Sequence, residues 1–243
     1  MKNILFIILL LIPVCVSAQL STDEKPISFD NARMSGVSKR RIKKVTMPSL
    51  DMAKIEKEDA EDEEMGFPPR FGYKHKVHLN LQNSGTWKEL ANGDRLWQLN
   101  IVCPGALSVN LLYDRFWLPE GGKLFIYSKD KSHSIGAFTS RNNKGDRDNV
   151  RGFATGLVYG DDVILEYYQP QNVTEEAIIS IDYVVHGYRY IIINDMTMRS
   201  SGSCQVNVNC PEGQNWQKEK KAVAMVIANG NRICTGSLII QQN

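Results

Sequence analysis

The sequence predicts an all-β protein, on the basis of two features found between Gly66 and Tyr190. Short runs in which apolar and polar residues alternate indicate strands with one buried face, rather than crossover helices. Between the runs stand groups rich in glycine, asparagine, aspartate and proline, which tolerate tight turns. The candidate strands are Lys76–Leu81, Arg95–Val102, Leu107–Phe116, Lys123–Ser128, Gly152–Val158, Val163–Gln169 and Ile178–Val185. Such a series is typical of a β-sandwich or jelly roll, here over residues 66–190.

Aromatic and branched residues on these strands supply the expected core, because they fill the space between two sheets efficiently. The predicted inward positions are Trp97, Phe116, Trp117, Leu124, Ile126, Tyr127, Phe153, Ile164 and Tyr167. A carbohydrate-binding face is the alternative use of the same aromatic residues, and packing is favoured over it.

The first residues have the pattern of a secretory signal. Lys2 supplies a positive charge, residues 4–16 are almost wholly apolar, and small residues up to Ala18 favour cleavage before Gln19. Pro13 interrupts the apolar run, which is shorter than a membrane span requires. We therefore expect residues 1–18 to be a signal peptide, and the remaining chain to be secreted or periplasmic, without membrane contact.

Residues 19–65 are highly charged and poor in aromatic residues. A basic run from Lys39 to Lys44 is followed by an acidic run from Glu56 to Glu64. Opposite blocks like these usually belong to solvated segments that bury little apolar area. The sequence therefore predicts a charged linker, in which Ser49-Leu50-Asp51-Met52 either caps a short helix through Ile55 or stays unstructured.

The overall composition gives no electrostatic reason to expect nucleic acid as a partner. Hydrophobic residues make up 42% of the chain, and its formal net charge is +2. We also predict no cofactor and no metal site. His75 and His78 lie three positions apart on a strand, so their side chains are expected on opposite faces and exposed near its end.

Three phrases with a cysteine stand near the end of the sequence: Ser201-Gly202-Ser203-Cys204, Cys210-Pro211-Glu212-Gly213 and Cys234-Thr235-Gly236-Ser237-Leu238. They resemble the opening of the peptidase domain in secreted trypsin-like serine endopeptidases, in particular the lysyl-endopeptidase-like bacterial family. The resemblance implies that Cys204, Cys210 and Cys234 each form a disulfide with a cysteine further along the chain. An odd number of clustered cysteines in an oxidising compartment also suggests missing partners.

The stretch ahead of these phrases is similar to the pro-region that precedes such peptidases. The phrases that carry this similarity are Arg70-Phe71-Gly72, Gly85-Thr86-Trp87, Asn92-Gly93-Asp94-Arg95-Leu96-Trp97, Pro104-Gly105-Ala106, Leu118-Pro119-Glu120-Gly121, Leu124-Phe125-Ile126-Tyr127, Gly160-Asp161-Asp162 and His186-Gly187-Tyr188-Arg189. Cys103 departs from the family pattern, and we expect it to be a buried apolar side chain. The resemblance implies a pro-region that assists folding and restrains activity before cleavage.

Residues 191–203 combine polar and small side chains and are expected to form a processing loop. Arg199 is the basic residue just before the first cysteine phrase, so cleavage is predicted between Arg199 and Ser200. The resemblance implies that residues 204–243 are the first strands of an incomplete trypsin-like β-barrel. Ala222–Ala228 and Arg232–Ile240 read as two strands around an Asn-Gly turn. Because the rest of the barrel is missing, we expect residues after 204 to be poorly packed, or to rest opportunistically on the sandwich.

The chemistry of such a peptidase requires a histidine, an aspartate and a serine. The histidines of this sequence are His75, His78, His133 and His186, and none follows Cys234, where the resemblance places the catalytic histidine. We therefore expect no catalytic residue in this chain and no activity from it alone. The resemblance implies that the full-length enzyme cleaves proteins after Lys or Arg. The expected partners are the chain's own downstream peptidase domain and the protein substrates of the full-length enzyme.

An alternative interpretation comes from a different class of protein. It is a non-catalytic exported module whose β-sandwich binds protein or carbohydrate, and whose cysteine-containing tail is a remnant. The DNA beyond codon 243 distinguishes the two. A continuing frame with Thr-Ala-x-His-Cys favours the peptidase precursor, and a stop codon favours the binding module.

Overall fold

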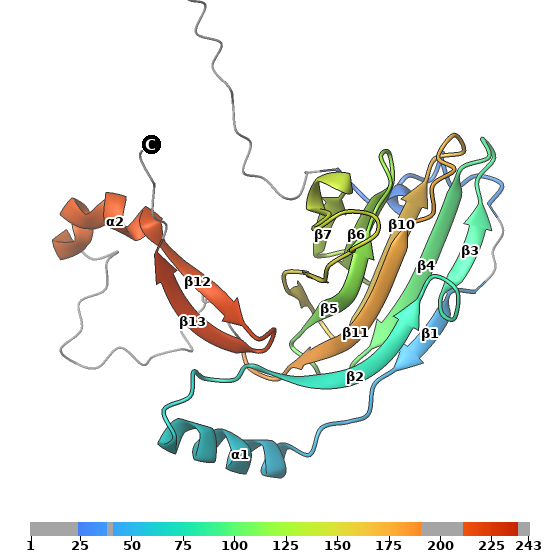
Figure 1. Cartoon of the computed structure of the whole chain (residues 1–243). Coiled ribbons are helices and arrows are strands. Elements are labelled where there is room, and N and C mark those ends of the chain that lie inside the picture. The colour runs from blue at the N-terminus through green and yellow to red at the C-terminus, as the bar shows by residue number, and fades with distance from the viewer. Residues whose placement is uncertain (1–23, 38–40, 191–210, 238–243) are drawn as a thin grey trace, which may run out of the picture.

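The computed structural model of the chain describes residues 24–37, 41–190 and 211–237. In this part of the chain, two β-sheets face each other across a shared hydrophobic core. A separate hairpin of β12 (Val223–Ala228) and β13 (Arg232–Ser237) lies beyond one end of the sheets (Figure 1). The prediction of a mainly β protein is confirmed.

The first sheet is built around β4, whose two edges are both paired. Its strand order is β1 (Lys43–Thr46), β4 (Arg95–Val102), β10 (Asp162–Gln169), β6 (Lys123–Ser128) and β7 (Ser134–Phe138), and β3 (Thr86–Glu89) also pairs with β4. β3 pairs with residues 95–98 of β4 and β1 with residues 99–102. The β1–β4 pair is parallel, and the other pairs are antiparallel.

The second sheet is antiparallel, and its long strands reach the end of the molecule that faces the hairpin (Figure 1). Its order is β2 (Gly72–Asn80), β11 (Ile178–Gly187), β5 (Ser108–Trp117) and β8 (Phe153–Ala154), with β9 (Val158–Tyr159) also on β5. A single strand had been expected over 152–158. It is divided because the hydroxyl oxygen of Thr155 accepts the N–H of Leu111 at 3.1 Å, in place of a ladder bond.

The core between the sheets contains most of the side chains predicted to be there. Trp97, Leu124 and Tyr167 are fully buried. The indole N–H of Trp97 donates to the Ser84 carbonyl at 2.9 Å. Gly85, with φ +70°, lies against this ring, and a Cβ at that position would approach it to 2.3 Å. Only glycine fits there, because the backbone is left-handed and the indole occupies the side-chain space.

Three residues predicted to point inward lie outside this core. Trp117 is half-buried and donates its indole N–H to Glu175 at 2.8 Å. Tyr127 and Ile164 lie in a separate apolar cluster with Phe125 and Phe29. This cluster and a second one around Leu96 are covered by residues 24–37, which we call the amino-terminal strap. Ile27 at the start of the 3-10 helix η1 (Ile27–Phe29) is 5% exposed.

The strap also satisfies a buried carboxylate on the first sheet. Glu166 is 0% exposed, and its Oε1 accepts the backbone N–H of Ser28 at 3.1 Å. Its Oε2 accepts from the Gln98 amide at 3.0 Å and from the Tyr127 hydroxyl at 2.9 Å. The hydroxyls of Ser28 and Tyr127 are hydrogen-bonded to each other at 2.9 Å. The buried carboxyl group is tolerated here because several donors surround it.

Replacing Ser28 by alanine is expected to lower the free energy of unfolding by about 1 kcal/mol, because the Tyr127 hydroxyl loses a partner in a largely buried site. Urea denaturation measures this loss. Ser35→Ala, at an exposed position of the same strap, serves as the control and is expected to change stability by less than about 0.5 kcal/mol. Equal effects of the two substitutions would contradict this role of the strap.

The charged linker predicted for residues 19–65 is corrected by the described parts of that segment. Besides the strap, it contributes β1 and the 13-residue helix α1 (Met52–Glu64). Three apolar residues of the segment, Ile27, Met47 and Ile55, are buried, whereas Met52 and Met65 stay exposed. The Asp51 side chain accepts the Lys54 N–H at 3.1 Å and caps α1, which continues well beyond Ile55.

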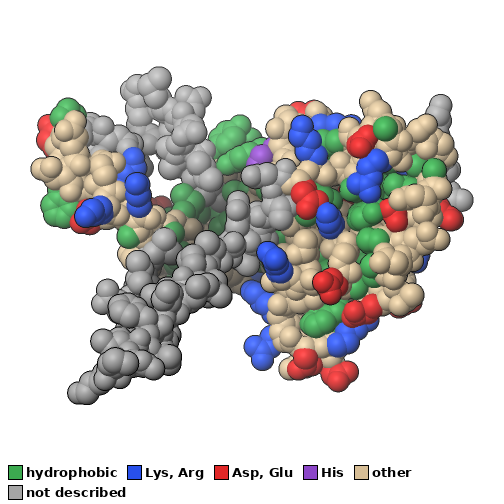
Figure 2. All heavy atoms as spheres, turned by 90° about the horizontal axis from the view of Figure 1, so that it is seen from above, with side chains coloured by type: hydrophobic (Ala, Val, Ile, Leu, Met, Phe, Trp, Pro, Cys, Tyr) green, Lys and Arg blue, Asp and Glu red, His purple; other side chains and the backbone are tan. Residues whose placement is uncertain are grey.

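The remaining described helices are the 3-10 helices η2 (Ser140–Asn142) and η3 (Pro211–Trp216) and the short α2 (Gln217–Ala222). None of the helices in the described ranges is long and apolar enough to cross a membrane. The predicted signal peptide, residues 1–18, lies outside the described residues. Basic and acidic side chains are interspersed over the face of the sandwich seen in Figure 2.

Candidate functional site: the junction of sandwich, helix and hairpin

The turn of the β12–β13 hairpin approaches the end of the second sheet, and α1 lies below β2 at the same end (Figure 1). Asn229 and Gly230 at the turn have φ values of +50° and +76°. Positive φ at both central residues is the signature of a type I′ turn, which Asn-Gly favours. We call the contact of hairpin residues 227–233 with α1 and the second sheet the junction.

Position 230 requires glycine for two reasons, its positive φ and the close approach of a neighbouring side chain. A Cβ at Gly230 would lie 2.5 Å from a methyl carbon of Leu112 on β5. The Gly230 carbonyl accepts the side-chain amide of Asn110 at 3.1 Å, also from β5. Lys74 on β2 donates to the side-chain oxygen of Asn229 at 3.1 Å. The turn is therefore held by side chains from two strands of the sandwich.

The start of β13 continues this contact through the main chain. The Asn231 carbonyl accepts the Phe71 N–H at 2.9 Å, and its side-chain amide donates to the Gly72 carbonyl at 3.0 Å. The Ile233 N–H donates to the Pro69 carbonyl at 2.9 Å. These bonds add the hairpin to the segment before β2 in the manner of an added strand. Asn231 is 7% exposed, and its main-chain carbonyl and side-chain N–H both have partners, whereas its side-chain oxygen has none among the described residues.

An apolar patch lies beneath these hydrogen bonds. Phe71 and Val185 of the sandwich are fully buried there, and Leu112 packs against them. Ile227 and Ile233 supply the hairpin side of the same cluster. The junction thus combines main-chain hydrogen bonds with burial of apolar surface, the two contributions that a specific contact requires.

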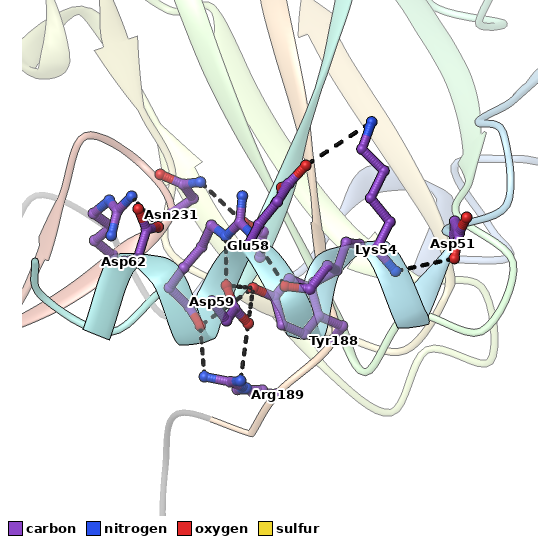
Figure 3. A network of polar contacts seen from close by, with 12 residues as sticks. Asp51, Lys54, Glu58, Asp59, Asp62, Tyr188, Arg189 and Asn231 are labelled. Atoms are coloured by element: carbon purple, nitrogen blue, oxygen red, sulfur yellow. Dashed lines mark hydrogen bonds and ion pairs between the residues drawn. The ribbon is translucent and has the colours of Figure 1, made fainter. Parts of the chain in front are cut away.

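Asp59 organises the α1 side of the junction (Figure 3). Its side chain is 7% exposed and accepts the Arg70 Nε–H at 2.8 Å. It also accepts the Tyr188 hydroxyl at 2.9 Å, and it forms an ion pair with Arg189 at 2.8 Å. The same carboxylate therefore binds the segment before β2 and the segment after β11. Glu58 adds a second ion pair to Arg70, at 3.1 Å.

The surroundings of Arg70 and Tyr188 raise the pKa of both side chains. Burial works to lower the pKa of Arg70, but the hydrogen bonds to Asp59 and Glu58 outweigh it and raise the pKa further above its ordinary value. Burial, together with the hydrogen bond to Asp59, raises the pKa of Tyr188 to about 12. The arginine thus stays charged and the tyrosine stays a neutral donor at physiological pH.

A second ion pair connects α1 directly to the hairpin. The Arg232 guanidinium contacts Asp62 at 2.6 Å and donates to the Pro68 carbonyl at 2.8 Å. It also lies 5.4 Å from the centre of the Phe67 ring. Helix α1 is therefore part of the surface that holds the hairpin.

The rest of residues 211–237 has few such contacts. Trp216, Val223, Met225 and Val226 are between 43% and 60% exposed, and α2 buries none of its residues. The expectation that residues after 204 are poorly packed holds for these positions. For the turn the other expected outcome applies, because it rests on the sandwich, and its main-chain groups and the Asn231 amide have specific partners there.

Most of the residues singled out in the sequence for processing or disulfides lie outside the described residues, namely Arg199, Ser200, Cys204 and Cys210. Cys234 lies on β13, half-buried, and is a free thiol in the described part of the chain. Cys103 is fully buried among apolar side chains, as expected. Burial raises the pKa of its thiol to about 12, with a further contribution from Asp161.

His75 is a correction to the sequence prediction, since it is 8% exposed, whereas His78 is exposed as expected. The two do lie on opposite faces of β2. The ring of His75 lies 5.9 Å from that of His186 on β11. His75 and Val184 are opposite each other in the ladder, and Val184 belongs to the core, so both histidines lie on the inner face. Within the described residues, no group of three or more His, Cys, Asp or Glu side chains could hold a metal ion.

A recess of about 430 Å³ lies away from the junction, beside Trp87 and Arg95. The Arg95 guanidinium lies 4.2 Å from the centre of a Trp87 ring. The indole N–H donates to the Leu81 carbonyl at 3.3 Å. Because the guanidinium already covers one face of Trp87, that face is not open for stacking of a sugar.

Sequence reasoning missed the junction, although two phrases of the resemblance, Arg70-Phe71-Gly72 and His186-Gly187-Tyr188-Arg189, meet there. The available signal was the spacing of Ile55 and Asp59. Residues four apart share one face of a helix, so a carboxylate beside an apolar position is directed to the buried side.

The comparisons with known proteins concern the hairpin first. A family model described as "Lysyl endopeptidase, C-terminal domain" matches residues 198–243, which include β12 and β13. This match supports a relation to lysyl endopeptidases in that part of the chain. Among solved structures, an isomalto-dextranase of Arthrobacter globiformis T6 complexed with panose is similar at 13% identity and a TM-score of 0.24. The similarity covers 49% of this chain and 21% of that one, and a TM-score this low supports no inference.

Proposed function

We propose that the chain is the amino-terminal part of the precursor of a secreted, trypsin-like serine endopeptidase, with the β-sandwich as its pro-region. The observation that carries this proposal is the family match over residues 198–243. The hairpin within the match is held by its turn at the end of the sandwich. The junction therefore lies between the proposed pro-region and the proposed start of the peptidase domain.

The exposed side of the hairpin supports the same proposal. Val223, Met225 and Val226 are exposed on β12, and apart from the contact near Arg232 the sheet β12–β13 pairs with no other strand of the described residues. In the proposed precursor, further strands of a trypsin-like barrel cover this face, and Cys234 pairs with a downstream cysteine. The catalytic histidine, aspartate and serine would likewise follow residue 243.

The role of the described residues in this proposal is to bind and position. The arginine, tyrosine and carboxylate groups of the junction are already engaged with one another. The sandwich would hold the first hairpin of the peptidase in place while the remaining barrel folds, and would restrain the enzyme until the chain is cut. Export by the segment of residues 1–18 and cleavage between Arg199 and Ser200 complete the proposed maturation.

The alternative of an exported binding module has less support. Its candidate site in the described residues is the recess beside Trp87, and one face of that ring is covered by Arg95. Nothing comparable to the family match at 198–243 favours it.

The test is maturation of the protein encoded by the full open reading frame. We expect cleavage between Arg199 and Ser200, read from the amino-terminal sequence of the product, and hydrolysis of peptides after lysine or arginine. Arg199→Ala is expected to leave the precursor uncut, because a trypsin-like site needs the basic side chain. Lys218→Ala, at an exposed position of α2, is the matched control and is expected to be processed normally. A new amino terminus outside residues 196–203, or peptide hydrolysis by residues 1–243 alone, would contradict the proposal.

A further inference from the structure

We infer that the junction is a receptor site which recognises hairpin residues 227–233 as a separate partner, and which keeps them bound after the connecting chain is cut. The identity of this partner as the start of a peptidase domain rests on the proposed function. The binding itself depends only on contacts within the described residues.

The contacts that hold the hairpin come from residues far from it in sequence. Asn231 and Gly72 are 159 positions apart, and Asn110 and Gly230 are 120 positions apart. These bonds join residues within 41–190 to residues within 211–237. A cut between the two ranges removes the tethering effect and breaks none of the bonds named here.

Asn231 gives the site its selectivity for this turn. Its main-chain carbonyl and its side-chain amide both bond to the short segment of Phe71 and Gly72. Any residue at this position can offer the main-chain carbonyl, but only the side-chain amide of asparagine donates to the Gly72 carbonyl, and a hairpin without it leaves that buried acceptor with one bond fewer.

Arg232 gives the site its charge complementarity. The side chains of Arg232 and Asp62 are each 21% exposed, and the same guanidinium donates to the Pro68 carbonyl. Charge-assisted hydrogen bonds of this kind are stronger than neutral ones, particularly where solvent is partly excluded. Because Asp62 lies on α1, the helix completes the receptor, and Asp59 anchors that helix to Arg70 and Arg189.

The turn also fits by shape, because Gly230 lies against Leu112 where a side chain would collide. Ile227 and Ile233 flank it on the apolar patch of Phe71 and Val185. A tight type I′ turn between two isoleucines is therefore the class of ligand that this surface accepts.

The experiment uses the full chain with a site-specific protease sequence inserted after Arg199 and an affinity tag at the amino terminus of the exported form. After cleavage, we expect the carboxy-terminal fragment to remain with the tagged fragment in gel filtration and on resin. A dilution series gives the dissociation constant. Asn231→Ala and Arg232→Ala are each expected to raise this constant by about tenfold.

Lys218→Ala is the matched control, since it removes a charge from the same fragment outside the junction, and it is expected to leave retention unchanged. Circular dichroism before cleavage shows that each variant keeps the sandwich folded. Immediate separation of the fragments at micromolar concentration, or equal behaviour of Asn231→Ala and Lys218→Ala, would overturn the inference. A dimer before cleavage would also overturn it, because the hairpin would then belong to a second copy. Peptidase activity is not read in this experiment, so its failure is distinct from failure of the proposed function.

Discussion

Replacing Asp59 by alanine is expected to lower the free energy of unfolding of the protein by about 3 kcal/mol. This is the cost of removing one partner of a buried ion pair, here the pair that holds α1 on the sandwich. The Arg70 side chain is 12% exposed and would keep its charge without its main partner. Tyr188 would lose both of its bonds to the carboxylate. Arg189, whose side chain is 44% exposed, can be hydrated instead and adds little to the loss.

Urea denaturation followed by circular dichroism, together with hydrogen exchange of the α1 amides, measures this effect. Asp59→Asn keeps an acceptor for Arg70 but removes the charge, so we expect it to lose less stability than Asp59→Ala. Glu64→Ala, at an exposed position at the end of the same helix, is expected to stay within about 0.5 kcal/mol of the parent. If Asp59→Ala and Glu64→Ala were equally stable and equally protected, Asp59 would not be the anchor of α1.

The position of Asp59 links the stability of α1 to the binding of the hairpin. Asp62 can meet Arg232 only while α1 stays on the sandwich, and Asp59 holds it there through Arg70 and Arg189. Asp59 and Asp62 lie three residues apart on α1. Asp59 binds arginines of the sandwich, and Asp62 binds Arg232 of the hairpin. Helix α1, in a segment whose composition suggested a solvated linker, therefore connects the sandwich to the hairpin.

The strands whose first and last residues could be predicted are those determined by neighbouring residues in the sequence. β4 and β6 are rich in branched and aromatic residues and are bounded by turn residues, so their limits follow from sequence. β1 and β3 are short and polar, and they form because β4 offers a free edge to them. The strap lies on the sheet because Glu166 and Leu96, more than 60 positions away, make a surface for it. Pairing of this kind is not encoded in a local window of sequence.

The junction shows the same division between local and distant information. The Asn229-Gly230 turn can be predicted from the sequence, because its backbone geometry depends on those two residues. Its partners Asn110 and Gly72 have no local feature that marks them. Asp59 stands in an acidic run where it resembles its neighbours, and only the helical spacing from Ile55 separates it from them.

Lowering the pH from about 7 to about 5 is expected to destabilise the sandwich by about 2 kcal/mol through His186. Burial, and then the neighbouring His75, lowers the pKa of His186 from its ordinary value of 6.5 to about 4, although Asp161 acts in the opposite direction. Burial also lowers the pKa of His75. His186 Nδ1 and His75 Nε2 are buried without a hydrogen-bond partner among the described residues. Protonation of either ring therefore places an uncompensated charge beside the core.

The direction of the pH effect follows from the number of protons that the folded and the unfolded chain bind. Between pH 6.5 and pH 4 the unfolded chain binds a proton at His186 and the folded chain does not, so stability falls as the pH falls through this window. Urea midpoints at both pH values measure the change. His186→Gln is expected to reduce the pH dependence whatever its effect at neutral pH, because glutamine does not titrate. His78→Gln, on the exposed face of the same sheet, is expected to retain the full dependence. If His186→Gln kept it as well, the buried histidine pair would not be its source, and carboxylate titration would have to explain the loss.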